Sequence, residues 1–454
     1  DEAIFALCTD ALIKAFGVGT DKQRMDSTHI RSNMRKLGRL RIFGETIRGF
    51  LRELKRVAPD RHAGLDTAMR ARYEGEEGGG CFGRVRPSEA GAVQEQAVQD
   101  LAMLVERFRA DRAVAELASY KLLERVIEEQ CTVTRDKDDA PPQTKLKTPK
   151  DVPSDSLQNP SDPDAGYSGH KGQGYTAQIM ETYTTAEEDA TILSLITHVA
   201  VTPAHVGDSG ALAPALQQTA GRGCGAQEVT ADSAYGSDDN QQAAAALGVV
   251  LVAPTAGGDD ARNGSLGIKD FTCDEATLTI KACPRGQAAL QTETTRTERK
   301  VTVFDRETCA ACPDRERCPV KVTATRACIY YEDLQIRLAL RRQYEATDAF
   351  RDRYRWRAGI EGTNSRLKSQ TGAGRLRVRG LARVRFAVRL KALGLNILRA
   401  ARAYAARMRR LEELAAILRP IWSFFHAIRS IRIGLDQFSL IIGENRPLTW
   451  NVAA

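Results

Sequence analysis

Four charged or polar side chains stand at helical spacings between positions 354 and 368. They are Tyr354, Arg357, Glu361 and Lys368. Offsets of three, four and seven residues place side chains on one face of a helix, so we expect all four on one helix face. A single carboxylate surrounded by Tyr, Arg and Lys suits a divalent metal that lies beside a phosphate. The alternative interpretation is a surface helix with one acid among many bases.

A second candidate acid follows an apolar run that predicts a buried strand. The run Val229-Thr230-Ala231 leads directly into Asp232. Open α/β sheets carry their reactive groups at the carboxyl ends of strands, so Asp232 stands at a suitable place. Aspartate is common at strand ends, and the position alone is therefore a weak indication of a site.

Basic residues are concentrated around the first motif. From Arg351 to Arg410 the chain has eighteen Lys and Arg against two acids, a net charge of +16, whereas the whole chain has a net charge of +8. The remaining 394 residues therefore sum to −8. A strongly basic segment on a mildly acidic body indicates a surface that binds a polyanion such as nucleic acid. A solvated helix face is the alternative, but sixteen unbalanced charges exceed what such a face usually has.

The composition is that of a folded protein in a reducing compartment. The 454 residues are 42% hydrophobic and 27% charged, which excludes a disordered or fibrous chain. No apolar run reaches about 18 residues, so we expect no membrane span. Ten unevenly spaced cysteines predict a reduced, intracellular protein. The chain begins at Asp1 rather than Met, which predicts a truncated N-terminal segment.

Hydrophobic periodicity and composition divide the chain into segments of helical, strand or mixed pattern. Alternating strands and helices follow a Pro-rich linker and predict an α/β domain with a mixed sheet flanked by helices. The expected segments are an N-terminal helix (1–20), a first strand (21–45), a helical insertion (46–135), the continued α/β core (136–255), a Cys-rich subdomain (256–335), the Glu-bearing and basic helices (336–418) and an irregular apolar tail (419–454).

Together these features resemble the DDE transposases of bacterial insertion sequences, specifically the group with the signature Tyr-x2-Arg-x3-Glu-x6-Lys. The residues between 354 and 368 fit that spacing, and the segments 231–237 and 374–380 are typical of such proteins. The resemblance extends from Asp26 to about Ala405. It implies an RNase H-like fold, with a helical insertion after the first strand and a Cys-rich insertion before the Glu-bearing helix.

The resemblance also implies where the first acid lies. In this family the first aspartate is on the first strand, often within Asp-Gly-Thr or Asp-Ser-Thr, and Asp26 with its Ser-Thr neighbours fits. Asp162 or Asp164 is the alternative, because the surrounding segment also resembles a family segment. The proline between these two aspartates argues against a regular central strand there, so Asp26 is preferred.

By this resemblance the protein is a DNA transposase that cleaves the ends of an insertion sequence and joins them to target DNA. Asp26, Asp232 and Glu361 would hold two Mg²⁺ or Mn²⁺ ions, since hard divalent cations prefer oxygen ligands. Further cationic or aromatic side chains would bind the DNA: Tyr354, Arg357, Lys368, Arg375, Arg377 and Arg379.

The partners implied by the resemblance are double-stranded DNA, both terminal inverted repeats and target, and further copies of the chain in a dimer or larger assembly. No membrane partner is expected, and the expected location is the bacterial cytoplasm, at the nucleoid. Two other functions stay open: an RNase H-like endonuclease without strand transfer, and an inactive transposase that only binds DNA.

The cysteines between 273 and 328 form a separate motif. Cys309 and Cys312 form a Cys-x2-Cys pair, Cys318 follows, and Cys283 precedes them. Such thiols in a subdomain too small for a large core predict a structural Zn²⁺ site, and related transposases carry a similar Cys-rich insertion. The spacing is not that of a standard zinc finger. Cys273 or Cys328 could therefore replace one ligand, and free thiols or an iron–sulfur cluster are the alternatives.

Overall fold

The computed structural model describes residues 2–74, 85–86, 88–134, 143–185, 193–257 and 264–442. The chain divides into two compact units. The first contains Asp1–Thr185 and Ser194–Asn396, and the second contains Ala186–Leu193 and Ile397–Ala454. None of the helices in the described ranges combines the length and the hydropathy needed to cross a membrane.

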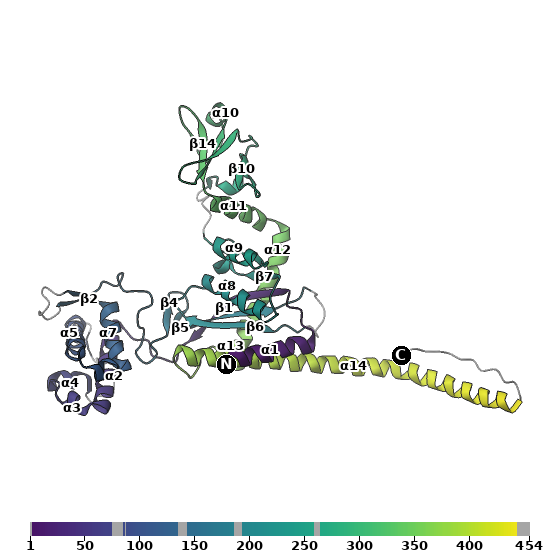
Figure 1. The fold of residues 1–454 in the computed structure, drawn as a ribbon, viewed down its shortest axis with the longest axis horizontal. Helices are drawn as coiled ribbons and strands as arrows, with labels where there is room; N and C mark the ends of the chain where they lie inside the picture. The colour runs from purple at the N-terminus through teal and green to yellow at the C-terminus, as the bar shows by residue number, and fades with distance from the viewer. Residues whose placement is uncertain are drawn as a thin grey trace. The chain divides into compact units, whose positions relative to one another are not determined.

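A six-stranded mixed sheet organises the first unit (Figure 1). Its antiparallel part consists of β1, β5, β4 and β6, where β4 and β6 pair with successive stretches of β5. Its parallel part adds β7 to β1 and β8 to β7. The bounds are β1 (Lys22–Arg31), β4 (Gly166–Ser168), β5 (Gly172–Thr182), β6 (Ile196–Pro203), β7 (Glu228–Ala231) and β8 (Val250–Val252). The expectation of a mixed sheet flanked by helices is confirmed.

Helices cover both faces of this sheet because its strands are apolar on both sides. Ile179 and Met180, neighbours on β5, belong to opposite cores. Successive strand residues point to opposite faces, so each strand contributes to two apolar layers. One face packs against α1 (Glu2–Phe16), α13 (Gly359–Thr371) and the beginning of α14 (Leu381–Ile442), and the other against α8 (Leu212–Gly221) and α9 (Asp238–Ala246).

Between β1 and β5 in sequence, a group of helices builds its own core. The first of them, α2, places Phe43, Ile47, Phe50 and Leu54 on one buried stripe, as expected for an amphipathic helix. A short hairpin closes the group. Its elements are α2 (Arg39–Val57), α3 (Pro59–Ala63), α4 (Thr67–Glu74), α5 (Ala90–Phe108), α6 (Arg112–Ala115), α7 (Ala118–Gln130), β2 (Cys131–Thr134) and β3 (Gln143–Leu146).

The Cys-rich region forms two small sheets with a shared apolar core that includes Phe271, Phe304 and Tyr331. Its larger sheet has the order β11-β12-β14-β13. The elements are η4 (Ile268–Asp270), β9 (Thr272–Asp274), β10 (Thr279–Ala282), β11 (Gln291–Thr294), β12 (Lys300–Phe304), α10 (Arg306–Ala310), β13 (Lys321–Val322) and β14 (Ala327–Tyr331).

The C-terminal helix extends further along the chain than the sequence predicts. After α11 (Asp333–Glu345), α12 (Asp348–Tyr354) and α13, helix α14 continues to Ile442. The tail from 419 onward was expected to be irregular, yet its described part is helical as far as Ile442. The proline at 420 is compatible with an end of the helix, but a proline within a helix can also be accommodated as a kink. Residues 443–454 lie outside the described ranges.

Candidate active site

Strand register brings the first two candidate acids together. β1 and β7 run parallel, and their last paired residues are Met25 and Ala231. Asp26 and Asp232 are the next residue on each strand, so they emerge from neighbouring strands at the same level. Asp232 then caps the short helix η2 (Ser233–Tyr235), since its carboxylate accepts a hydrogen bond from the Ala234 amide at 3.0 Å.

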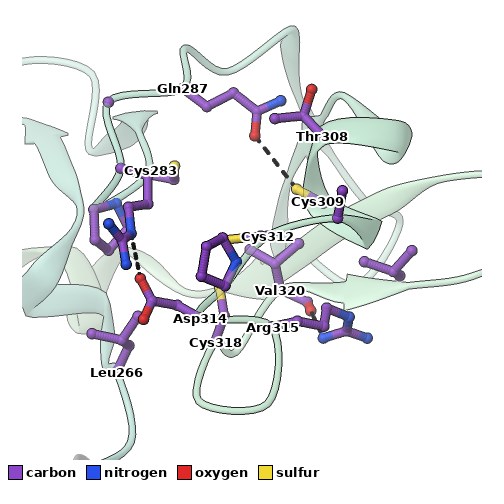
Figure 2. A pocket seen from close by; sticks show the side chains of 16 residues that line it. Leu266, Cys283, Gln287, Thr308, Cys309, Cys312, Asp314, Arg315, Cys318 and Val320 are labelled. Atoms are coloured by element: carbon purple, nitrogen blue, oxygen red, sulfur yellow. Dashed lines mark hydrogen bonds and ion pairs between the residues drawn. The ribbon is translucent and has the colours of Figure 1, made fainter.

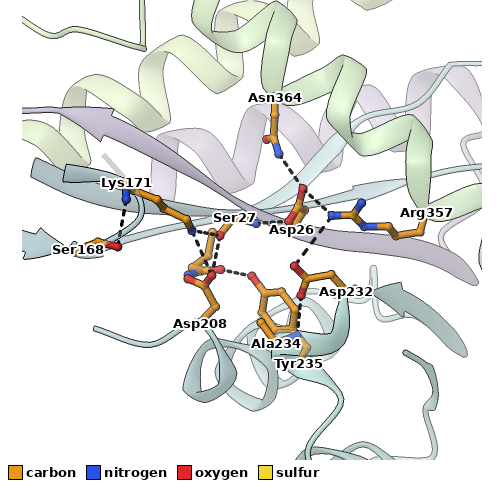
Figure 3. A network of polar contacts seen from close by, with 11 residues as sticks. Asp26, Ser27, Ser168, Lys171, Asp208, Asp232, Ala234, Tyr235, Arg357 and Asn364 are labelled. Carbon is orange, nitrogen blue, oxygen red and sulfur yellow. Dashed lines mark hydrogen bonds and ion pairs between the residues drawn. The ribbon is translucent and has the colours of Figure 1, made fainter. Parts of the chain in front are cut away.

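Asp26 lies in the interior and has several fixed partners (Figure 3). Only 7% of the residue is exposed. Its carboxylate accepts hydrogen bonds from the Ser27 amide at 2.8 Å and from the Asn364 side chain at 3.2 Å. Burial raises the pKa of Asp26 and nearby Asp232 adds to the rise, whereas Arg357 opposes it. Asp26 is thus a rigidly held carboxylate that a cation would stabilise in its charged form.

The segment that carries Glu361 is not one continuous helix, contrary to the sequence expectation. α12 ends at Tyr354, the 3-10 turn η5 covers Arg355–Ala358, and α13 begins at Gly359. Arg24 on β1 donates a hydrogen bond to the Trp356 carbonyl at 2.9 Å. A Cβ atom on Gly359 would overlap the guanidinium of Arg24. The glycine therefore lets the turn lie directly against the Arg24 side chain.

Despite the break, one guanidinium unites the three candidate acids. The terminal nitrogens of Arg357 lie 3.2 Å from Asp26, 4.0 Å from Asp232 and 2.6 Å from Glu361. Burial by itself would lower the pKa of Arg357, but Asp26, Tyr354, Asp232 and Glu361 together raise it. The Glu361 side chain is 65% exposed, so the cluster is buried at Asp26 and open at Glu361. We call these four residues the acid cluster.

Tyr354 and Lys368 border the acid cluster. Tyr354 stacks on Phe350 with ring centroids 5.3 Å apart, and burial raises the pKa of its hydroxyl. Burial lowers the pKa of Lys368, Lys171 lowers it further, and Asp26 acts in the opposite direction. Both signature residues therefore lie within electrostatic range of Asp26.

The alternative first acids, Asp162 and Asp164, are outside the cluster. Asp162 is fully buried and accepts hydrogen bonds from Tyr175 at 2.6 Å, from the Gly380 amide at 2.8 Å and from Ser32. Asp164 accepts a hydrogen bond from the Leu381 amide at 2.8 Å. Leu381 is the first residue of α14, so these aspartates fix the start of that helix.

The basic loop before α14 exposes Arg375, Arg377 and Arg379. It is anchored to the end of β1. The Arg31 amide donates to the Gly374 carbonyl at 3.1 Å, and the backbones of Arg31 and Arg375 pair in an isolated parallel β-bridge. Buried Leu376 alternates with the exposed arginines. The loop thus presents its cations to solvent next to the strand that carries Asp26.

Sequence reasoning missed a polar network around Ser27, next to Asp26 on β1 (Figure 3). Ser27 donates to Asp208 at 2.7 Å, and the Lys171 ammonium lies 2.9 Å from the Ser27 hydroxyl and 3.3 Å from Asp208. Gln178 donates to the other Asp208 oxygen at 2.7 Å. These residues follow no short-range motif, and only the Asp-Ser pair at 26–27 pointed to the region.

The cysteines line a pocket of about 490 Å³ (Figure 2). The set expected from spacing is present in its lining: Cys283, Cys309, Cys312 and Cys318. The two suggested substitutes, Cys273 and Cys328, are not among the lining residues. Burial raises the pKa of Cys309 to about 11, with Cys318, Cys283 and Cys312 adding to the effect. At neutral pH this thiol is protonated.

Neither group of side chains is arranged as a complete metal site. Within the described ranges, no group of three or more His, Cys, Asp or Glu side chains could hold a metal ion as placed. The thiols of the cysteine pocket therefore give no geometric support to zinc. In the acid cluster, the donors suit Mg²⁺ in type and charge, but Arg357 lies among the carboxylates it would bind.

A family model matches part of the chain. Residues 282–401 match the family model of a transposase DDE domain. The matched segment includes Glu361 and its signature neighbours but neither Asp26 nor Asp232. No curated protein and no solved structure matches the chain. The match covers about a quarter of the chain, and within it the chain is similar to a transposase DDE domain.

Proposed function

We propose that the chain is a DNA transposase that cleaves the ends of an insertion sequence and joins them to target DNA. The observation that carries this proposal is the acid cluster: three carboxylates converge on one arginine, and Arg357 and Glu361 lie within the segment that matches a transposase DDE domain. One acid of the cluster is buried and the other two are more exposed. This arrangement supports the proposal more specifically than the family match alone does.

The order of the strands supports an RNase H-like fold. The antiparallel strands β1, β5 and β6 come first in the sequence. Strands β7 and β8 follow and extend the sheet in parallel on the other side of β1. Asp26 lies on the central strand and Asp232 at the carboxyl end of its parallel neighbour. We infer that the helices α2–α7 are an insertion after the first strand of this fold.

In this proposal Asp26, Asp232 and Glu361 hold the divalent ions, Mg²⁺ or Mn²⁺. Such ions activate a water or a DNA hydroxyl and stabilise the leaving oxygen of the phosphodiester. Arg357 partly offsets the negative charge of the cluster in the free protein. Its planar guanidinium also suits a phosphate, so we infer that it turns from the carboxylates to the phosphodiester when DNA is bound.

The surrounding side chains would hold the DNA. We propose that Tyr354 and Lys368 bind the phosphodiester or a flipped base at the cut end. The exposed arginines of the loop before α14 would contact backbone phosphates, which position DNA without reading its sequence. Such contacts make binding strongly dependent on salt.

A test compares two DNA substrates in Mg²⁺ or Mn²⁺: an intact duplex that carries the flanking element ends, and the same ends already cut. A transposase cleaves the first and joins the second to a target duplex. Cleavage without joining of the pre-cut end would favour a nuclease. Binding without either reaction would favour an inactive DNA-binding protein.

We also propose that the second half of α14 pairs with a second copy of the chain. From Ile397 onward, apolar residues recur at alternating spacings of four and three, as in a coiled coil. They are Ile397, Ala401, Tyr404, Met408, Leu411, Ala415, Leu418 and Trp422. The large members are exposed, from 39% at Met408 to 76% at Trp422. Arg407 and Glu412 flank the stripe, and in a parallel pair they would face each other across the helices.

The molar mass in solution, measured by light scattering, tests this pairing. The intact chain should be a dimer, and Leu411→Glu should make it monomeric. Arg409→Gln, off the stripe, should leave the dimer intact. A monomeric wild-type protein would contradict the proposal.

For the cysteine pocket we propose a structural Zn²⁺ on donor chemistry alone, since four thiols line one cavity and zinc prefers sulfur ligands. The zinc content of the purified protein tests it. One zinc per chain that is lost in the double variant Cys309→Ser, Cys312→Ser would support zinc. The absence of metal would favour free thiols, and a visible absorption spectrum would favour an iron–sulfur cluster.

A further inference from the structure

We propose that Lys171, together with Lys368 and Arg31, forms a binding site for a DNA backbone phosphate beside the acid cluster. The inference rests on the proposed function, because its ligand is the DNA strand that enters that cluster. It adds a residue from the β4–β5 turn, which belongs to no motif of the sequence.

Lys171 is held at one end of the acid cluster by the turn and by β1. Its amide donates to the Ser168 hydroxyl at 3.3 Å, which shapes the turn between the two strands. Its ammonium contacts the Ser27 hydroxyl and the Asp208 carboxylate. Ser27 directly follows Asp26 on β1, so the ammonium is anchored one residue away from the buried acid.

The Asp208 carboxylate that holds the Lys171 ammonium is itself fixed by further hydrogen bonds. Asp208 accepts from Ser27 and Gln178, and Tyr235 donates to the Gln178 side chain (Figure 3). The Asp208 side chain is only 15% exposed, whereas that of Lys171 is 36% exposed. An ammonium has three N–H donors and these two contacts use two of them. The contacts with Ser27 and Asp208 therefore orient the Lys171 ammonium, and its third N–H donor is left for a ligand on the exposed side.

Two other cations lie within electrostatic range of Lys171. Burial lowers the pKa of His29, and Lys368, Lys171 and Arg31 each lower it further. Lys171 also lowers the pKa of Lys368. Three cations thus act on one histidine, and Lys171 and Lys368 repel each other. An anion at this place would relieve the repulsion.

The position of Arg31 favours a polymer over a free anion. Arg31 is at the end of β1, and its backbone is bonded to the basic loop that exposes Arg375. Arg31 therefore connects the cations that act on His29 with the exposed arginines of that loop. Several separate cations match the repeated phosphates of one DNA strand.

The salt dependence of DNA binding tests the site without cleavage. The probe is a fluorescent duplex of arbitrary sequence, titrated in EDTA at several chloride concentrations. For Lys171→Gln the slope of log affinity against log salt should become shallower by about 0.9, the value for one lost phosphate contact. Lys171→Arg should keep the wild-type slope. Lys121→Gln, a surface lysine on α7 that pairs with Glu116, should also keep it.

An unchanged slope for Lys171→Gln would overturn the inference. Competition specific to inorganic phosphate at constant ionic strength would overturn it as well, because the site would then take a free anion. Amide hydrogen exchange of β1 and β5 in each variant identifies a folding defect. Failure of the wild type to cleave DNA would count against the proposed function alone, since this binding assay needs no metal and no reaction.

Discussion

The acid cluster and the cysteine pocket differ in how the chain assembles them. The acids come from three distant positions, and their approach depends on the pairing of β1 with β7 and on the turn before α13. The cysteines come from one short stretch, Cys283–Cys318, within a subdomain that has its own core. The first site therefore depends on the whole domain, whereas the second depends on local folding.

The two sites also differ in how their charge is balanced. The carboxylates share the guanidinium of Arg357, which lies within 4.0 Å of each. The thiol of Cys309 is kept neutral by burial, with a pKa of about 11. A charged cluster with an internal counter-ion can exchange that ion for a ligand, whereas a neutral thiol must lose its proton before it binds metal. This difference agrees with the proposal of a chemical role for the acids and a structural role for the cysteines.

The largest expected effect is on catalysis. Asp232→Asn should lower the rate of DNA cleavage by about 10³-fold, because a metal ligand contributes several kcal/mol to the transition state. Hydrogen exchange in the cysteine subdomain should not change. Asp239→Asn, an exposed acid in α9, is the matched control. Equal cleavage by the two variants would remove Asp232 from the site.

The second prediction separates the central sheet from the cysteine subdomain by the pH dependence of their stability. His198 on β6 is buried, and burial lowers its pKa from 6.5 to about 4. Between these values the unfolded chain takes up a proton that the folded chain does not, so stability falls as the pH falls, by about 3 kcal/mol in all. Amides of β5 and β6 should lose protection from pH 6.5 to 4.5, and those of β12 and β14 should not.

In this experiment the control is His198→Gln, which should reduce the pH dependence of the central sheet. If β12 and β14 lose protection in parallel with the sheet, the two regions unfold together, and the contrast between a domain-wide and a local site fails.

A third prediction concerns the turn that aligns Glu361. Gly359→Ala should destabilise the protein by about 1–3 kcal/mol, because the added methyl group would push the Arg24 guanidinium away from Glu181 and the Trp356 carbonyl. It should also reduce cleavage, since it displaces the start of α13. Gly362→Ala, in the same helix but with open space around the added atom, should be neutral or stabilising by up to about 1 kcal/mol. Urea unfolding of both variants measures the difference, and equal values would contradict the close-approach argument.

The smallest effect on cleavage is expected in the cysteine pocket. Cys309→Ser removes a ligand of the proposed Zn²⁺, so it should destabilise the subdomain by more than about 1 kcal/mol, the value for an ordinary point substitution, and leave DNA cleavage within a few-fold of wild type. Hydrogen exchange of β12 and β14 together with a cleavage assay provides the measurement. Loss of cleavage at unchanged stability would place the cysteines in the chemistry.

The sequence was informative wherever local pattern determines structure. The alternation around Asp26 and the apolar run before Asp232 predicted the strands that carry these acids, and the mixed sheet followed from their order. The break before α13 was not predictable, since it depends on a contact between Arg24 and Trp356, more than 300 residues apart. Lys171 and Asp208 escaped for the same reason, because only the fold brings them to Ser27.

The binding of Mn²⁺ tests the central claim most directly, because it asks whether the three acids form one cation site without requiring a particular DNA. Free Mn²⁺ can be titrated by electron paramagnetic resonance against wild type, Asp26→Asn, Asp232→Asn, Glu361→Gln and the control Asp239→Asn. We predict that each of the three cluster variants loses Mn²⁺ binding and that the control retains it. Binding that is equal in all five proteins would contradict a shared metal site at Asp26, Asp232 and Glu361.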